Sequence, residues 1–542
     1  MKHPIKQLVT GVALGLGLIV GIGVKAATMP QPTAVIDTTS GPVQGLVVDN
    51  IHTFKGIRYG KAPVGTLRFL PPQAPEKSTD RIDATSFGAP CVQMASGATA
   101  VPTSDFGLTI KTVFPTPGEM KIDNEDCLFL NVWTPNTGDN KARPVMFWIH
   151  GGGYAYGSSS WPVYDGENLS RRGDVVVVSV NHRLNVFGYL HLAEIFGDEY
   201  KNSGDAGMQD LVLSLQWVRD NIGAFGGDKD NVTIMGESGG GSKVSHLLAM
   251  PSAQGLFHKA VIQSGPGLTS TPADAATAMA KGVLKNLGFE DTTATNRQAM
   301  LAKLQTVTAD ELLAAGASGG MRYGPVIDGD VLPRHPFTPA APEISKNIPI
   351  LIGSNKDEMT IFQASEPWFG KFTEEQLQTY AERVPNGTAL LAEFRTIYPN
   401  YSPTHLRTQL DSSRFTYGSI VLAERKAAQN AAPVYMYYLT WETPVNNGMF
   451  RTPHTLDMPF MFDTVEKSIA LVGTGPEPQK MADQMSEAWL AFAKTGNPNT
   501  KALPKWPAYD AKTRATMIFN LPSKVVNDPN ANIRKILAGV DN

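Results

Sequence analysis

A serine set between glycines is the feature of this chain that most clearly points to chemistry. Residues 231–250 read NVTIMGESGGGSKVSHLLAM, so an apolar β-branched run meets Gly-Glu-Ser-Gly-Gly and then apolar residues at helical spacing. A serine on such a sharp strand-to-helix turn has an exposed hydroxyl, and it needs small neighbours because the backbone there is strained and crowded. The pattern predicts that Ser238 is a nucleophile at the carboxyl end of a strand.

The same five-residue pattern recurs at 316–320, with Ser318 in the serine position. A helical segment precedes this second match and no strand leads into it, so the required strand–turn–helix context is missing. We therefore interpret Ser318 as part of a loop. For Ser238 the alternative is an ordinary glycine-rich turn, and the rest of the chain must decide between the two.

A serine nucleophile also needs N–H groups that stabilise the oxyanion of the tetrahedral intermediate. Residues 148–154 read WIHGGGY, a strand end followed by three glycines whose bare backbone can approach a substrate oxygen closely. We expect the N–H groups of Gly152 and Gly153 to act together with that of Gly239, the residue after the nucleophile. The alternative is a plain glycine-rich turn.

The base should be a histidine late in the chain, because triads of this kind follow the order serine, acid, histidine. Five histidines follow the serine: His246, His258, His335, His405 and His454. The first two lie too close to leave room for another strand and an acid, the third is in a proline-rich loop, and the fourth is in a polar helical stretch. His454 is in a proline-bounded loop after the apolar run 434–439, and it is the predicted base.

The acid should follow a strand that lies between the serine and the histidine. The apolar run 348–352 leads into Asp357 and Glu358, whereas Asp328 and Asp330 occupy a glycine-flanked turn. Each of these carboxylates could instead be a solvated loop residue. Spacing alone therefore leaves the identity of the acid open.

The elements that must position these residues are predicted by near-continuous apolar runs, which are typical of strands buried on both faces of a parallel sheet. They are 145–149, 175–180, 232–235, 260–262, 348–352 and 434–439. Helical patterns lie between them, over 208–222 and 481–492, with Gly223 and Gly496 near their ends. Alternating strands and helices predict an α/β sheet with its site at the carboxyl ends of the strands. Residues 54–59 are expected at an antiparallel edge.

Six motifs occurring in order resemble the type-B carboxylesterase family, which includes the cholinesterases. They are FKGIRYGKAPVGTLRF (54–69), NEDCLFLNVWTP (124–135), HGGGY (150–154), WVRDNIGAFGGDKDNVTIMGESGG (217–240), NKDE (355–358) and HTLDMPF (454–460). The resemblance implies an α/β-hydrolase fold, with a mostly parallel central sheet flanked by helices and long insertions around the active site. It also implies a catalytic triad of Ser238, Glu358 and His454.

The resemblance further implies an oxyanion hole of Gly152, Gly153 and Gly239, and a disulfide between Cys91 and Cys127. Glu237 matches an acid that supports the family's site, the alternative being a surface charge.

The chain also departs from the family pattern. Gly239 stands where the family most often has alanine, and residues 181–185 replace the usual Tyr-Arg-x-Gly run. Cholinesterases hold the choline cation with a tryptophan in the loop between the two cysteines. Residues 92–126 contain no tryptophan, only Phe106 and Phe114 as large aromatics. A choline ester is therefore a poor substrate prediction.

The N-terminal segment differs from the rest of the chain. Lys2 and Lys6 precede an uncharged apolar run over 8–24, and Val24-Lys25-Ala26 has the small-residue spacing that signal peptidase recognises. The run is shorter than the roughly 20 apolar residues of a spanning helix, so a cleaved signal is favoured over an anchor. We predict a signal peptide over 1–26, cleaved near Ala26, a single α/β-hydrolase domain over 27–542, and no stable membrane span.

Composition is that of an ordinary globular protein. The chain has 542 residues, a net charge of −3 and two cysteines. A basic excess that would favour nucleic acid is missing. An even pair of cysteines in a periplasmic or secreted protein predicts a disulfide, with two free thiols as the alternative. Two cysteines without a close pair of histidines predict no zinc site, and we expect no metal and no cofactor.

The residues and the family resemblance together predict an exported serine carboxylesterase that acts on small-molecule esters through an acyl-enzyme. An amidase or thioesterase on the same machinery is the first alternative. The second is a non-catalytic adhesion or binding protein on the esterase fold, similar to the neuroligins. Those proteins lose the nucleophile, whereas Ser238 is present here.

Overall fold

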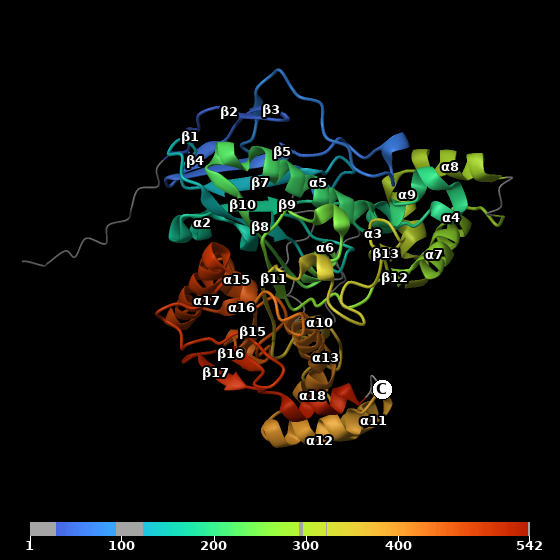
Figure 1. Cartoon of the computed structure of the whole chain (residues 1–542). Coiled ribbons are helices and arrows are strands. Elements are labelled where there is room, and N and C mark those ends of the chain that lie inside the picture. The colour runs from blue at the N-terminus through green and yellow to red at the C-terminus, as the bar shows by residue number, and fades with distance from the viewer. Residues whose placement is uncertain (1–28, 94–122, 292–295, 321, 540–542) are drawn as a thin grey trace, which may run out of the picture.

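A mixed sheet of 12 strands forms the centre of the computed structural model, which describes residues 29–93, 123–291, 296–320 and 322–539. Figure 1 shows the sheet running from the blue N-terminal strands to the red β16 and β17. In order across the sheet the strands are β1 (Gln31–Pro32), β4 (Leu46–Val48), β5 (Ile51–Arg58), β7 (Phe129–Thr134), β9 (Val176–Val180), β8 (Arg143–Ile149), β10 (Gly227–Glu237), β11 (Lys259–Gln263), β14 (Ile350–Asn355), β15 (Val434–Leu439), β16 (Ala515–Phe519) and β17 (Lys524–Asn527).

The strands from β9 to β16 run parallel to one another, and antiparallel strands continue the sheet at both ends. All six apolar runs predicted as buried strands lie in this parallel part. The run 54–59 lies almost entirely in β5, which pairs antiparallel with β7, so its predicted place at the antiparallel edge is confirmed. The predicted fold class, an α/β sheet flanked by helices, is confirmed as well.

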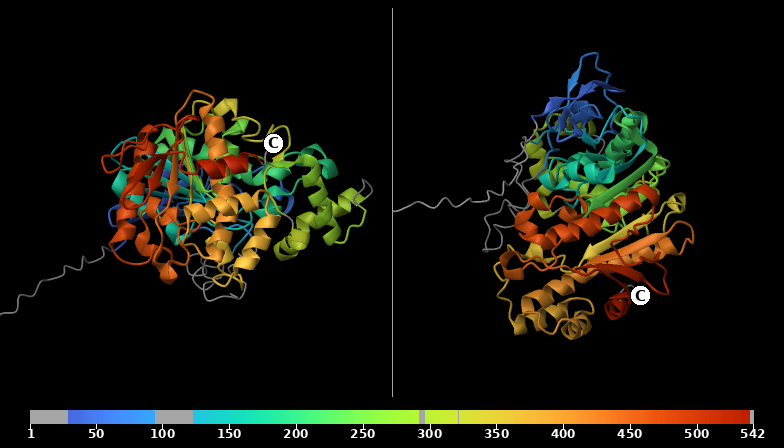
Figure 2. Two further views of the ribbon diagram at one scale, coloured as in Figure 1. Left: turned by 90° about the horizontal axis from the view of Figure 1, so that it is seen from below. Right: turned by 90° about the vertical axis from the view of Figure 1, so that its left-hand side faces the viewer.

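Helices cover both faces of the sheet, as the two views of Figure 2 show. Side chains alternate along β8: Phe147 and Ile149 pack on one face, and Met146 and Trp148 on the other. Because both faces are dry, these strands are apolar throughout instead of alternating with polar residues.

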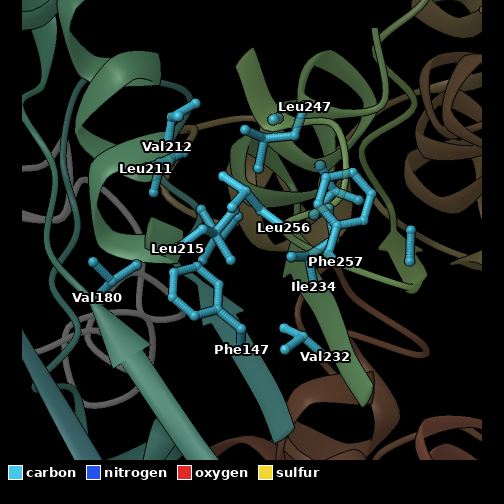
Figure 3. Packing of buried hydrophobic residues seen from close by; sticks show 14 of the residues in the cluster. Phe147, Val180, Leu211, Val212, Leu215, Val232, Ile234, Leu247, Leu256 and Phe257 are labelled. Carbon is cyan, nitrogen blue, oxygen red and sulfur yellow. The ribbon is translucent and has the colours of Figure 1, made fainter. Parts of the chain in front are cut away.

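The first face is covered by α5 (Ala206–Asn221), α6 (Gly239–Leu247) and α13 (Pro403–Ala427), and the second by α2 (Glu167–Gly173) and α17 (Pro476–Thr495). Figure 3 shows Leu215 of α5 and Leu247 of α6 in the cluster that lies over Phe147. Each such fully buried side chain stabilises the fold by about 1.5–3 kcal/mol. This packing anchors α6, the helix that follows the predicted nucleophile.

Two helix ends follow from their sequences. The α5 helix ends at Asn221, close to the predicted end, and a short 3-10 segment then leads to Gly226 in the left-handed conformation. The α17 helix ends at Thr495. The next residue, Gly496, has a left-handed φ of 76°, and its N–H donates to Phe492 O at 2.7 Å. Glycine adopts this conformation at no steric cost, which explains the predicted stop.

The other helices form smaller groups around the sheet. They are α3 (Asn185–Tyr189), α4 (Ala193–Phe196), α7 (Ala273–Asn286), α8 (Arg297–Thr306), α9 (Ala309–Ala317), α10 (Thr360–Gln363), α11 (Glu374–Arg383), α12 (Gly387–Ile397), α14 (Val445–Gly448), α15 (Asp457–Met461), α16 (Ile469–Val472) and α18 (Ala531–Ala538). Two small sheets are formed by β2 (Ile36–Thr38), β3 (Gly41–Gln44) and β6 (Ile82–Asp83), and by β12 (Thr271–Pro272) and β13 (Val326–Ile327). In Figure 1, α7, α8 and α9 lie together at one side of the molecule.

Cys91 and Cys127 form a disulfide, as predicted. Most of the loop that it closes, including Phe106 and Phe114, lies outside the described residues, and so does the predicted signal peptide at 1–26. Across the ranges that the structure describes, no helix has the length and apolar character needed to cross a membrane.

Candidate active site

Ser238 lies at the sharp turn between β10 and α6, as its sequence context predicts. Its backbone has φ 58° and ψ −125°, and its N–H donates to Gln263 O at 2.8 Å. A sparsely populated backbone conformation of this kind costs a non-glycine residue about 1–3 kcal/mol. The neighbouring glycines are sterically required: a Cβ on Gly236 would lie 2.4 Å from the carbonyl carbon of Gly240. Ser318, by contrast, follows α9 in a short 3-10 segment, with no strand leading into it.

The HGGGY segment follows β8, which is the sheet neighbour of β10, and this register brings it beside Ser238. Gly152 and Gly153 have φ values of +92° and +58°, and a Cβ on Gly152 would lie 1.9 Å from Tyr156 O. The N–H groups of these two glycines and of Gly239 donate to no backbone acceptor within the described residues. A Cβ on Gly239 would lie 2.6 Å from Gly153 N, so the two backbones are in close contact. Three uncommitted N–H donors therefore gather beside the serine.

His454 and Glu358 lie in contact, each on a loop that follows a parallel strand. Glu358 follows β14 and His454 follows its neighbour β15. His454 Nδ1 and Glu358 Oε2 are 2.5 Å apart, and both side chains are buried. The Asn355 N–H donates to Glu358 Oε1 at 2.7 Å, which orients the carboxylate.

The other three carboxylates that spacing had left open point elsewhere. Asp357 is buried but accepts from Gln409 Nε2 at 2.6 Å and from the Thr452 N–H at 3.2 Å. Asp328 accepts from Asn202 Nδ2 at 3.0 Å, and Asp330 pairs with Lys201 at 2.8 Å. Of the four, Glu358 is the one in contact with the histidine.

Glu237 is 1% exposed, which excludes the surface-charge alternative. Its Oε1 lies 3.1 Å from His454 Nε2, on the opposite side of the ring from Glu358. Burial raises the pKa of Glu237 to about 8. For His454, burial favours the neutral ring, but the nearby carboxylates of Glu237 and Glu358 outweigh this effect and raise the pKa to about 9. His454 Nε2 has no hydrogen-bond partner in the described part of the chain, so no bond to Ser238 Oγ is formed.

Several neighbours of the site carry no distinguishing signal in the sequence. Asp457 is a further buried carboxylate near His454, held by Tyr437 OH at 2.7 Å and by Gln263 Nε2 at 2.8 Å. Phe362 and Phe415 pack against the His454 ring with centroids 5.0 and 5.4 Å away. Asp457 lies within the HTLDMPF motif, but spacing does not separate it from an ordinary helix-start aspartate.

The family model described as the carboxylesterase family matches residues 32–535. The chain belongs to the carboxylesterase family. The resemblance stated from the motifs is thereby confirmed, and so is the enzyme class, a serine carboxylesterase.

This carboxylesterase is 36% identical over 518 residues to the para-nitrobenzyl esterase of Bacillus subtilis, covering 93% of this chain and 98% of that protein. A crystal structure of a Geobacillus stearothermophilus carboxylesterase matches with a TM-score of 0.77 at 36% identity, over 93% of this chain and all of that one (100%). An esterase from Clostridium hathewayi, described as hydrolysing aliphatic aromatic polyesters, matches with a TM-score of 0.77 at 32% identity, over 94% of this chain and 100% of its own.

The glycine at 239 yields a first prediction. In Gly239→Ala, the new Cβ would lie 2.6 Å from Gly153 N, closer than real Cβ atoms approach, so the 150–154 turn must move. A displacement near 1 Å can lower kcat about 10- to 100-fold. We expect this loss with KM nearly unchanged, measured on a chromogenic aryl ester. Gly223→Ala is the control, because no atom lies within 4 Å of its added Cβ. A wild-type kcat in Gly239→Ala would argue against tight contact between the two glycines.

Proposed function

We propose that this carboxylesterase hydrolyses carboxylic esters through an acyl-enzyme on Ser238, with His454 as general base and acid and Glu358 as the orienting carboxylate. The observation that carries the proposal is the buried 2.5 Å contact between His454 and Glu358. The two residues lie on loops that follow neighbouring strands, and Ser238 follows another strand of the same sheet. This arrangement matches the roles of a serine triad.

In the proposed acylation, His454 Nε2 accepts the proton of the Ser238 hydroxyl while its oxygen attacks the ester carbonyl carbon. Such a hydrogen bond is often long or unformed in a free enzyme and tightens when substrate binds. The protonated imidazole then gives its proton to the leaving alcohol. Water attacks the acyl-enzyme by the same route, which releases the acid and restores the serine.

The proposed oxyanion hole consists of the N–H groups of Gly152, Gly153 and Gly239. Removing one donor of this kind costs about 2.7–4 kcal/mol of transition-state stabilisation. The positive end of α6, which begins at Gly239, adds to the same field. Glu358 keeps the imidazole in the tautomer that can accept at Nε2, and it stabilises the cation that forms.

The proposed substrates are small-molecule esters. The Bacillus subtilis relative is named for a para-nitrobenzyl ester. The alternative is an amidase or thioesterase. Measuring kcat/KM on an ester, a thioester and an anilide that share one acyl group distinguishes these activities from ester hydrolysis. The proposal predicts the highest value for the ester, and a preference for the anilide would contradict it.

We also propose that the protein is exported and that its first 26 residues are removed. The disulfide between Cys91 and Cys127 supports this, because such bonds persist in oxidising compartments. N-terminal sequencing of the protein recovered from the periplasm or medium tests the proposal. A mature chain that still begins at Met1 would contradict it.

The carboxylates around His454 lead to a pH prediction. The base must be neutral to accept a proton, so activity rises with pH through the pKa of His454. Glu237 and Glu358 raise that pKa above its ordinary 6.5, so we expect the rising limb of kcat/KM at higher pH than an unperturbed histidine would give. Glu237→Gln removes the first of these charges and should move the limb to lower pH.

The control is Glu424→Gln. Glu424 lies on α13, away from His454, and forms an ion pair with Arg514 at 2.7 Å. Its profile should coincide with that of the wild type. A limb that stays in place in Glu237→Gln, or that moves to higher pH, would contradict the proposed electrostatic effect of Glu237 on the base.

A further inference from the structure

Lys243 is a buried amine that the proposed mechanism does not use. It lies on α6, five residues after Ser238, and it is 0% exposed. Burial lowers the pKa of its amine to about 7, and no carboxylate of the described residues opposes this shift. Enclosing an ammonium group without a counter-ion is unfavourable. Burial of this lysine therefore does not stabilise the fold, and its presence on α6 needs another explanation.

The amine of Lys243 contacts the start of the turn that carries the proposed oxyanion donors. Its Nζ donates to His150 O at 3.3 Å, the last carbonyl before the three glycines. The His150 ring stacks on His182 with centroids 4.5 Å apart. Burial lowers the pKa of His150 to about 3 and keeps its ring neutral, so these histidines add no competing charge.

Lys243 also contacts the end of the same turn. Its Nζ lies 4.8 Å from the centre of the Tyr154 ring, a cation–π distance. Tyr154 has a φ of +65°, in the left-handed region that side chains other than glycine rarely adopt. Its hydroxyl donates to Ser242 Oγ at 2.6 Å, so two consecutive residues of α6 hold this ring.

We propose that Lys243 is a positioning residue for the oxyanion-binding turn. It contacts both ends of residues 150–154 from the helix that follows the nucleophile, and it thereby directs the N–H groups of Gly152 and Gly153 toward the substrate oxygen. The inference rests on the proposed function, since it deepens the role of the same site. Lys243 acts through the backbone and touches neither substrate nor the reacting atoms.

The test compares Lys243→Met, which keeps the length of the side chain but removes the amine, with the wild type. We expect kcat on a chromogenic ester to fall about 10- to 100-fold with little change in KM. Affinity for an aryl trifluoromethyl ketone should fall by the same factor, because its serine adduct places an oxygen in the oxyanion position. Lys243→Gln, which keeps an N–H donor on a side chain one atom shorter, should retain more of both.

Thermal unfolding distinguishes positioning from a structural role. Removing a buried amine that has no counter-ion should leave the melting temperature of Lys243→Met unchanged or raise it, although activity falls. Lys426→Met is the matched control, since this lysine is 1% exposed and its Nζ donates to Ser345 O at 2.7 Å and Lys346 O at 2.8 Å. Its melting temperature should fall, with ketone affinity unchanged.

The outcomes separate this inference from the proposed function. A wild type that neither hydrolyses the ester nor binds the ketone would contradict the proposed function itself. An active wild type beside a Lys243→Met variant with unchanged kcat and ketone affinity would overturn the positioning role. That role would equally be overturned if Lys243→Met lost melting temperature while its folded fraction bound the ketone as tightly as the wild type.

Discussion

Ser238→Ala is expected to lower ester hydrolysis by about 10⁶ in kcat, the scale found when a triad serine is removed elsewhere. Alanine keeps the small side chain at the turn but has no oxygen to attack the carbonyl. The left-handed backbone at 238 is equally strained for both residues, so the fold should be retained. Initial rates on a chromogenic ester, with circular dichroism as a check on folding, measure this effect.

Ser318→Ala is the matched control, because it removes the serine of the other Gly-x-Ser-x-Gly match. That serine follows α9 and is not preceded by a strand, so full activity is expected. A folded Ser238→Ala variant that still turns over the ester would show that the nucleophile lies elsewhere in the chain.

Glu358→Gln should have the second largest effect, a loss of about 10⁴ in kcat with the fold intact, by analogy with the corresponding change in another triad. The glutamine side chain is nearly isosteric, but its amide can present N–H₂ to His454 Nδ1. The imidazole would then adopt the tautomer that cannot accept the serine proton. Steady-state kinetics on the same ester, together with the melting temperature, measure the effect.

Asp357→Asn is the control one residue earlier in the chain. Asp357 is as deeply buried as Glu358, but it bonds to Gln409 and to the Thr452 backbone instead of His454. We expect a lower melting temperature and a kcat within about 10-fold of the wild type. If Asp357→Asn were inactive and Glu358→Gln fully active, the acid would have been assigned one position too late.

The fold could largely be predicted because its parallel strands are buried on both faces. Runs such as 434–439 are apolar without interruption, and β15 spans the same residues in the structure. The limits of β10 were harder to predict, because this strand extends back to Gly227 through polar residues of the 228–231 segment. Those residues are exposed or half-buried, and they fall in the register shift between Gly227 and Val232, outside the pairing with β8 and β11, so hydrophobicity does not mark them.

The site could be predicted only as far as local pattern reaches. Ser238 and the three glycines of the 150–154 turn each lie in a strand-to-turn context that is visible in the sequence. The acid remained open among four carboxylates, because the contact between Glu358 and His454 joins residues 96 positions apart. The family motifs favoured Glu358, and this carboxylate lies in contact with His454 in the structure.

Residues whose role depends on burial were beyond the reach of spacing. Glu237 read equally well as a surface charge, and its enclosure against His454 becomes visible only in three dimensions. Lys243 has the ordinary appearance of a helix-surface lysine in the sequence, yet it faces the back of the 150–154 turn. Both side chains are buried because a neighbouring strand or loop covers them. The local sequence does not indicate this burial, since the covering residues are distant in the chain.

Covalent labelling with a fluorophosphonate tests directly whether Ser238 is the activated nucleophile. The reagent reacts with a serine that is activated by a base and faces an oxyanion hole, and peptide mass spectrometry locates the adduct. We expect one adduct, on Ser238, that forms in step with loss of ester hydrolysis and is lost in Ser238→Ala. An adduct on Ser318, or full inactivation with Ser238 unmodified, would contradict it.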